Sequence, residues 1–334
     1  MTASPPAARR DRRLIETSGG EFENERLSRG ANAAEALAVF LLLQVVLQSG
    51  IGSPPRPGDD PLARGIALAA AVIVGIYAIL VAPWLHRDGR HGRGLPEPSE
   101  LRGAWNRYDT ARRLGAVVIV LAVPAVVAGA GWDSLLVRLG VRLTWPALYA
   151  ELTAPPWSAA GTAVAAAVFG LAIAGLLIRW TNLGSAARAM AWPVGFLLAG
   201  IAAAAALQAA GSGDGIRVRL LIPRLAAYVP WALLQQWVLL AYFNTRIRKA
   251  VPPAGWGGLP GPFIAAGLTG VAFGSMHWPD APLASLTCVA GVVSGWLFLR
   301  DRSRNLFLLA LAHALAGALA TALGLLRMGV GPRL

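Results

Sequence analysis

The chain has 334 residues, of which 56% are hydrophobic and only 14% are charged. Soluble domains carry about 25% charged residues, so the composition excludes an ordinary soluble protein. The formal net charge is +13, but the arginines lie between apolar runs and form no single basic patch, which argues against a nucleic-acid-binding protein. We therefore expect an all-α, polytopic transmembrane helical bundle whose main partner is the lipid bilayer.

Residues 1–32 are polar, charged and proline-bearing. A signal peptide would place a short apolar core in this region, and none is present. We therefore expect a disordered cytoplasmic tail at 1–32, followed by an uncleaved first helix. Lys249 is the single lysine among 30 basic residues, and this arginine bias is typical of a GC-rich bacterial genome. The expected location is the inner (plasma) membrane of a bacterium.

Nine apolar segments follow the tail, and they predict about eight to nine membrane helices. They group into N-terminal transmembrane helices at 33–131 and a core at 132–326, with a C-terminal tail at 327–334. Segment 134–148 has leucines and arginines at helical spacing, so it is either an amphipathic helix on the membrane surface or an ordinary connecting helix. The nine candidate spans are 33–47, 65–85, 114–131, 157–178, 189–210, 220–243, 262–276, 283–299 and 305–326.

The distribution of positive charge predicts how the helices cross the membrane. With the N-terminus inside, 21 of the 30 basic residues fall in cytoplasmic segments. Cytoplasmic loops carry the excess of Lys and Arg in membrane proteins. We therefore expect a multi-pass protein with a cytoplasmic N-terminus and an external C-terminus.

Polar side chains inside the apolar segments gather in the last third of the chain, at Gln235, Gln236, His277 and His313. Such side chains are costly in hydrocarbon and usually have a partner or a function. The glutamine pair can also be interhelical glue, and each histidine a structural hydrogen-bonder. Neighbouring residues on a helix lie about 100° apart, so only one glutamine can point straight at a shared site. Gly317 lies one turn from His313 and predicts a surface free of side chains beside it.

Other residues of the same helices have structural interpretations. Asp280 precedes Ala281-Pro282 and is expected to be the N-cap of the helix that follows. Gly291 and Gly295 form a small-xxx-small pair that favours close helix packing.

The polar residues stand in an order that resembles a known family. Gln235-Gln236, then Phe273-x-x-x-His277, then His313 resemble the CPBP family of CAAX-type proteases and bacteriocin-processing enzymes, also called Abi. The family's three motifs are E-E-x-x-x-R, F-x-x-x-H and H-x-x-x-N or H-x-x-x-D. The resemblance implies an intramembrane endopeptidase that acts on membrane-associated or C-terminally tagged peptides. From the residues themselves we expect neither a cofactor nor a catalytic metal. In the family a motif-one glutamate and a histidine activate water, while the other histidine and the asparagine hold the oxyanion.

The chain departs from this pattern at several positions. Gln235 and Gln236 replace the two glutamates, Leu240 replaces the arginine and Gly317 replaces the asparagine or aspartate. An amide cannot take up a proton at physiological pH, and loss of a general base typically costs about 10²–10⁴ in rate. The predicted catalytic residues are His277, His313, Gln235 and Gln236, with activity that is reduced or lost.

Two other function classes stay open beside the protease. A non-catalytic relative would keep the pocket as a membrane binding or regulatory module. A transporter would use the polar residues as a pathway, but transporters usually carry intramembrane carboxylates, which the sequence is expected to lack. Zinc catalysis would need about three protein ligands, and two histidines fall short. Ser275 lacks the setting of a serine nucleophile.

Overall fold

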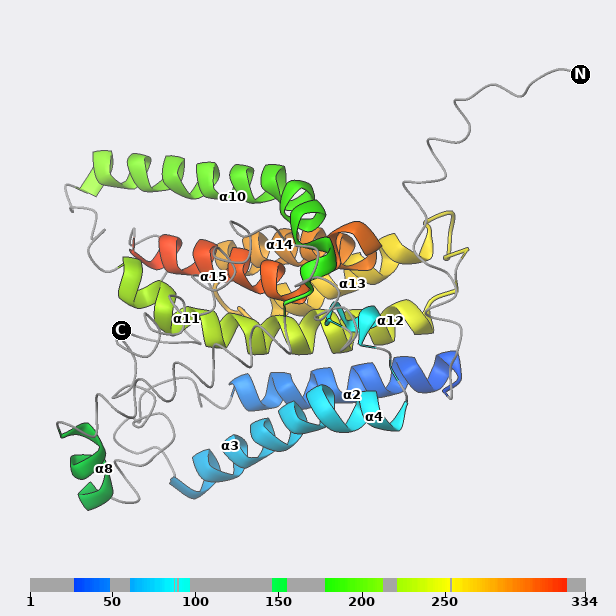
Figure 1. Cartoon of the computed structure of the whole chain (residues 1–334), viewed down its shortest axis with the longest axis horizontal. Coiled ribbons are helices and arrows are strands. Elements are labelled where there is room, and N and C mark those ends of the chain that lie inside the picture. Colours follow the sequence, from blue (N-terminus) through cyan, green and yellow to red (C-terminus); the bar gives the residue numbers. More distant parts are fainter. Residues whose placement is uncertain are drawn as a thin grey trace, which may run out of the picture. The chain divides into compact units, whose positions relative to one another are not determined.

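In the computed structural model, the described residues are 27–48, 61–96 without 87 and 89, 146–154, 178–212, and 221–322 without 253. Every regular element among them is helical, and the one β contact is an isolated bridge between Trp256 and Leu259. The predicted all-α class is confirmed for this part of the chain. The chain divides into two compact units, and each is described by itself (Figure 1).

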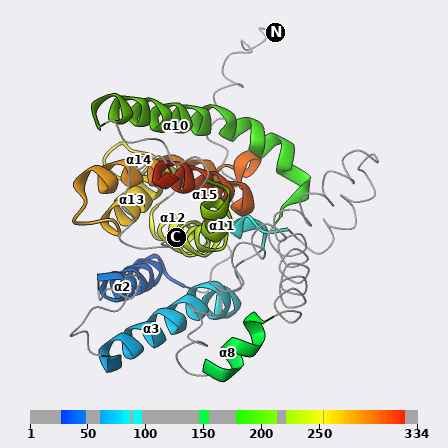
Figure 2. The ribbon, with the colours of Figure 1, turned by 90° about the vertical axis from the view of Figure 1, so that its left-hand side faces the viewer.

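The first unit comprises residues 1–51, 57–93 and 238–304. Helix α12 contacts both α2 and α13. Helix α3 packs along α2 and α14 lies against α13, as Figure 2 also shows. Its described elements are α2 (Arg29–Gln48), α3 (Pro61–Ile76), the π-helical η2 (Tyr77–Val81), α4 (Ala82–Leu85), the 3-10 turn η3 (His91–Arg93), α12 (Thr245–Ala250), α13 (Gly261–Ser275), α14 (Ala281–Leu299) and the 3-10 turn η8 (Asp301–Ser303).

Glycines bring α13 and α14 into close contact. A Cβ atom on Gly291 would lie 2.8 Å from the Cα of Gly270, and one on Gly295 would lie 3.2 Å from the Cα of Ala266. No side chain fits between backbones at the first distance, so the helices touch through their main chains there. The predicted packing role of the small-residue pair is confirmed.

The second unit comprises residues 52–56, 94–237 and 305–334. Helices α10 and α11 both pack on α15. Asn305 joins the starts of two helices: its Nδ2 donates to the Arg179 carbonyl at 3.0 Å, and its Oδ1 accepts from the Leu308 amide at 3.2 Å. The described elements are α8 (Pro146–Thr153), the 3-10 turn η5 (Trp180–Asn182), α10 (Leu183–Ser212), α11 (Leu221–Gln236) and α15 (Leu306–Ala322).

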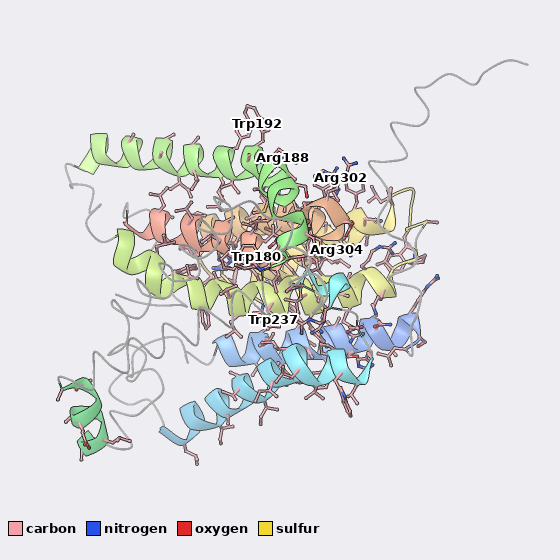
Figure 3. The ribbon with its side chains drawn as sticks, in the orientation of Figure 1. Trp180, Arg188, Trp192, Trp237, Arg302 and Arg304 are labelled. Atoms are coloured by element: carbon pink, nitrogen blue, oxygen red, sulfur yellow. The ribbon has the colours of Figure 1, made fainter. Side chains whose placement is uncertain are left out.

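Helix α10 bends after its first turns (Figure 1). Pro193 lies inside the helix, and an internal proline removes a backbone hydrogen bond and kinks the axis. The neighbouring Trp192 is 78% exposed and projects outward from the helix (Figure 3). A large exposed aromatic on an apolar helix is typical of a surface that faces lipid.

A π-helical segment, η7 (Trp237–Asn244), follows α11 directly and leads into α12. Its last residue anchors it in the first unit, where Asn244 Nδ2 donates to the Gly295 carbonyl at 3.0 Å and Asn244 Oδ1 accepts from Thr269 Oγ1 at 3.0 Å. π-Helical turns widen a helix and occur frequently at functional sites. Here the widened turn begins at the residue after Gln236.

Among the described residues, three helical segments are long and apolar enough to cross a membrane by length and composition: Gly65–Leu85, Trp180–Ala203 and Ala281–Leu299. Shorter apolar helices cover Gly261–Ser275 and Leu306–Ala320. The candidate span 114–131, all but the last residue of 157–178, and most of segment 134–148 lie outside the described residues. The count of eight to nine spans and the orientation therefore stay predictions.

Candidate active site

Gln236 and His313 meet where α11 packs on α15. The amide Nε2 of Gln236 lies 2.7 Å from Nδ1 of His313, and Gln236 is 1% exposed. An amide nitrogen only donates, so Nδ1 accepts and the ring proton of a neutral His313 lies on Nε2. The contact therefore sets the tautomer of His313 as well as its orientation.

Gln235 does not share this contact. The prediction that only one glutamine reaches a shared group holds for His313, and Gln236 is that residue. The Oε1 atoms of Gln235 and Gln236 and the indole nitrogens of Trp231 and Trp237 are all buried without a hydrogen-bond partner among the described residues. Orphaned buried polar atoms are uncommon in folded proteins. Four of them within two helical turns are consistent with a segment that binds a polar ligand.

His277 lies in the first unit, directly after the end of α13. Its Nδ1 is 2.9 Å from the Phe273 carbonyl oxygen, and the two rings meet edge-on with centroids 5.1 Å apart. A carbonyl oxygen only accepts, so Nδ1 carries the proton and Nε2 of the neutral ring is left as a base. Burial lowers the pKa of His277 below its ordinary 6.5, although the Phe273 carbonyl and the Asp280 carboxylate act in the opposite direction.

The two histidines therefore hold their protons on opposite nitrogens. His277 has Nε2 unprotonated, and His313 has Nε2 protonated. One ring is thereby suited to accept a proton and the other to donate a hydrogen bond. The structure joins Gln236 to His313, while His277 belongs to the other unit and is described on its own.

The residues around His277 have structural partners. Asp280 caps α14, since its Oδ1 accepts from the Leu283 amide at 3.0 Å, which confirms the predicted N-cap. Ser275 Oγ donates to the Ala272 carbonyl and accepts from Gln44 Nε2, each at 2.8 Å. The hydroxyl of Ser275 is thus held within the helix packing.

The predicted surface without side chains beside His313 is wrong. A Cβ atom on Gly317 would lie 2.7 Å from the ring of Tyr228, so the phenol of α11 fills the space that the glycine leaves. The edge of the same ring meets the His313 ring at a centroid distance of 5.7 Å. The sequence pattern did not reveal this, because Tyr228 comes from another helix.

A partly buried carboxylate contradicts the expectation that the helices lack one. Glu35 lies in the first predicted span, on α2, and its Oε1 accepts from Tyr242 at 2.9 Å and from Tyr77 at 3.2 Å. The two tyrosines lie on the two π-helical segments, η7 and η2. Its other oxygen is 3.1 Å from Nε2 of His86, an ion-pair distance without hydrogen-bond alignment.

Arg246 extends this group, which we call the Glu35 cluster: Glu35, Tyr77, His86, Asp88, Tyr242, Arg246 and Lys249. Arg246 is 1% exposed, donates to Asp88 Oδ2 at 2.6 Å and approaches Glu35 Oε1 at 3.6 Å. Lys249 donates to the other Asp88 oxygen at 2.9 Å. Two acidic and two basic side chains balance in charge, so the cluster ties α2, the segment after α4 and α12 together within the first unit.

No group of three or more His, Cys, Asp or Glu side chains that could hold a metal ion occurs among the described residues.

Comparison with known proteins places these residues in a family. Residues 217–319 match the model of the family described as type II CAAX prenyl endopeptidase Rce1-like. The predicted resemblance is confirmed, because this segment is similar to the CAAX protease family. No curated protein and no solved structure matches the chain.

The match to the CAAX protease family covers Gln235, Gln236, His277 and His313 together. It lies inside the predicted core at 132–326 and identifies the chain as related to peptidases. Together with its long apolar helices, it identifies a membrane protein.

Proposed function

We propose that the chain is an intramembrane endopeptidase that hydrolyses membrane-associated or C-terminally tagged peptides with a pair of histidines. The observation that carries the proposal is the opposite protonation of the two rings. His277 offers an unprotonated Nε2, and His313 offers an Nε2–H. Peptide hydrolysis needs a base for water and a donor for the oxyanion, and the family match spans both residues.

In the proposed reaction, His277 Nε2 removes a proton from water, whose oxygen adds to the scissile carbonyl carbon. The negative charge that forms on the carbonyl oxygen is stabilised by the Nε2–H of His313. The imidazolium of His277 then returns the proton to the leaving amine as the C–N bond breaks. The products are one carboxylate and one amine, and no covalent enzyme intermediate forms.

The glutamine at 236 has a positive role in this proposal. A glutamate there could only accept a hydrogen bond from Nδ1, and the proton of a neutral His313 would then leave Nε2. An amide that donates to Nδ1 keeps the proton on Nε2, where the oxyanion needs it. The base is thereby transferred from motif one to His277, whose lowered pKa leaves it unprotonated at neutral pH.

The orphaned polar atoms between Trp231 and Trp237 support a peptide as the substrate. A peptide backbone offers both N–H donors and C=O acceptors, which match the glutamine oxygens and the indole N–H groups in kind. We place the protein in the bacterial plasma membrane with its N-terminus in the cytoplasm, on the basis of the arginine distribution.

The test uses purified full-length protein reconstituted in liposomes with a membrane-anchored reporter peptide, and mass spectrometry to detect cleavage. We expect turnover by the wild type and its loss in His277→Ala and His313→Ala. Trp192→Phe, at an exposed position of α10, is the matched control and keeps full turnover. Retained peptide binding with no turnover would instead establish the non-catalytic alternative.

A further inference from the structure

The phenol of Tyr228 occupies the place of the family's third-motif side chain. This chain has Gly317 four residues after His313, where the CAAX protease family has asparagine or aspartate. A Cβ atom on Gly317 would lie 2.7 Å from Cε1, 2.8 Å from Cζ and 3.1 Å from the hydroxyl oxygen of Tyr228. An asparagine amide lies two bonds beyond its own Cβ. The hydroxyl of Tyr228 therefore lies in the region that such an amide would reach.

Tyr228 is held firmly at this place. It is 4% exposed, and its ring forms a T-shaped contact with the ring of His313, with a centroid distance of 5.7 Å and an interplanar angle of 67°. Gln236, on the same helix α11, contacts His313 through Nδ1. Helix α11 thus supplies both Gln236, which orients His313, and Tyr228, whose hydroxyl is a donor beside it. Tyr228, Gln236 and His313 belong to the same compact unit as Gly317.

A phenol and an amide share the property that matters for the reaction. Each presents a polar hydrogen to a developing negative charge, whereas glycine presents none at its side chain. Donors fixed in place before the reaction stabilise an oxyanion without reorganisation. A tyrosine from the facing helix can therefore replace an asparagine, provided that the asparagine position becomes glycine to admit the ring.

We propose that Tyr228 is a catalytic residue whose hydroxyl, together with Nε2–H of His313, donates to the oxyanion of the peptide substrate. The inference rests on the proposed function and deepens it. Gly317 is then part of the same exchange, because any larger residue would collide with the phenol. The chain has kept two oxyanion donors while changing which helix supplies the second.

The first test removes only the hydroxyl. Tyr228→Phe keeps the ring that packs on Gly317 and His313, and its thermal unfolding midpoint, compared with that of the wild type, measures any effect on folding. Loss of one oxyanion donor typically lowers kcat by about 10²–10³. An interaction made only in the transition state lowers kcat and kcat/KM equally, so KM stays unchanged. A purely structural role for Tyr228 would leave kcat intact.

The second test exchanges the two positions. Gly317→Asn alone collides with the ring and loses activity, and Tyr228→Ala alone loses the donor. The double variant Tyr228→Ala/Gly317→Asn restores the family's own arrangement, and we expect it to exceed both single variants in kcat. Gly267→Asn, at a helical glycine with open space around its Cβ position, is the control for placing asparagine on a helix.

The possible results separate this inference from the function on which it rests. Wild-type turnover that depends on His277 but is unchanged in Tyr228→Phe would overturn the role of Tyr228 alone. A double variant no better than Tyr228→Ala would contradict the exchange. Absence of His277-dependent turnover in the wild type would overturn the proposed function, and the role of Tyr228 with it.

Discussion

The amide of Gln236, which stands where the family has a glutamate, contacts His313: its Nε2 lies 2.7 Å from His313 Nδ1. It leaves the imidazole with its proton on Nε2. His277 has the reverse arrangement through the Phe273 carbonyl, and in the proposed mechanism it is therefore His277 that accepts the proton. A site that lacks its usual carboxylate can in this way keep both a base and a donor.

Substitutions of Gln236 should follow hydrogen-bonding ability. Gln236→Met keeps the size of the side chain but removes the donor, so both tautomers of His313 become populated and kcat falls. Gln236→Glu can only accept at Nδ1, so it removes the Nε2 proton from the neutral ring and lowers kcat further, toward the 10²–10³ that one oxyanion donor is typically worth. Steady-state hydrolysis measures both variants. A Gln236→Glu variant faster than the wild type would show that a carboxylate base is required.

The pH dependence of hydrolysis reports on His277. Its burial lowers its pKa, so the unprotonated base is fully present above the ordinary value of 6.5 and is lost only as the pH falls through the lower value in the folded protein. We expect kcat/KM to be level around neutral pH and to decline with a midpoint below 6.5. A midpoint at or above 6.5 would contradict the assignment. The profile of Gln235→Leu, in which both histidines remain, provides a comparison.

Removal of Glu35 should destabilise the first unit. Glu35→Ala leaves the buried Arg246 with Asp88, which it shares with Lys249, and takes the acceptor from two tyrosine hydroxyls. Breaking a buried charged pair from one side typically costs about 3–5 kcal/mol. Denaturant unfolding in detergent micelles measures the loss. Glu151→Ala, at an exposed position on α8, should cost almost nothing, and an equal effect of both substitutions would refute the structural role of the cluster.

Acid should weaken the same cluster through His86. Burial, followed by the positive charge of Arg246, lowers the pKa of His86, while Glu35 and Asp88 act in the opposite direction and Lys249 reinforces the lowering. A lowered pKa in the folded state means that the unfolded chain binds the proton first as the pH falls below 6.5. The free energy of unfolding contributed by neutral His86 is therefore complete above pH 6.5 and declines below it. His86→Gln should flatten this part of the stability profile. An unaltered profile would exclude His86 as the cause.

Much of the fold was predictable because hydrophobic runs and caps act locally. The predicted span 283–299 became α14 (Ala281–Leu299), since Asp280 and the following proline mark its start. Gly291 and Gly295 likewise predicted a close helix contact, because such contacts require small residues.

The site was predictable only in part, because it depends on how helices rotate against one another. Spacing showed that Gln235 and Gln236 could not both face one group, but the rotation of α11 against α15 decides which one does. Glu35 was missed because an apolar run with a single carboxylate still has the pattern of an ordinary membrane span. Its partners Tyr242 and Arg246 also lie more than 200 residues away in the sequence. The one sequence signal for the position of Tyr228 was Gly317, a glycine where the family has a larger side chain.

The proposed chemistry requires that His277 and His313 hold their protons on opposite nitrogens. Nitrogen-15 NMR of histidine-labelled full-length protein in micelles at neutral pH measures this directly, with the signals assigned from His277→Ala and His313→Ala. We expect an unprotonated Nε2 in His277 and a protonated Nε2 in His313. Two rings in the same tautomer, or an Nδ1 proton on His313, would contradict it.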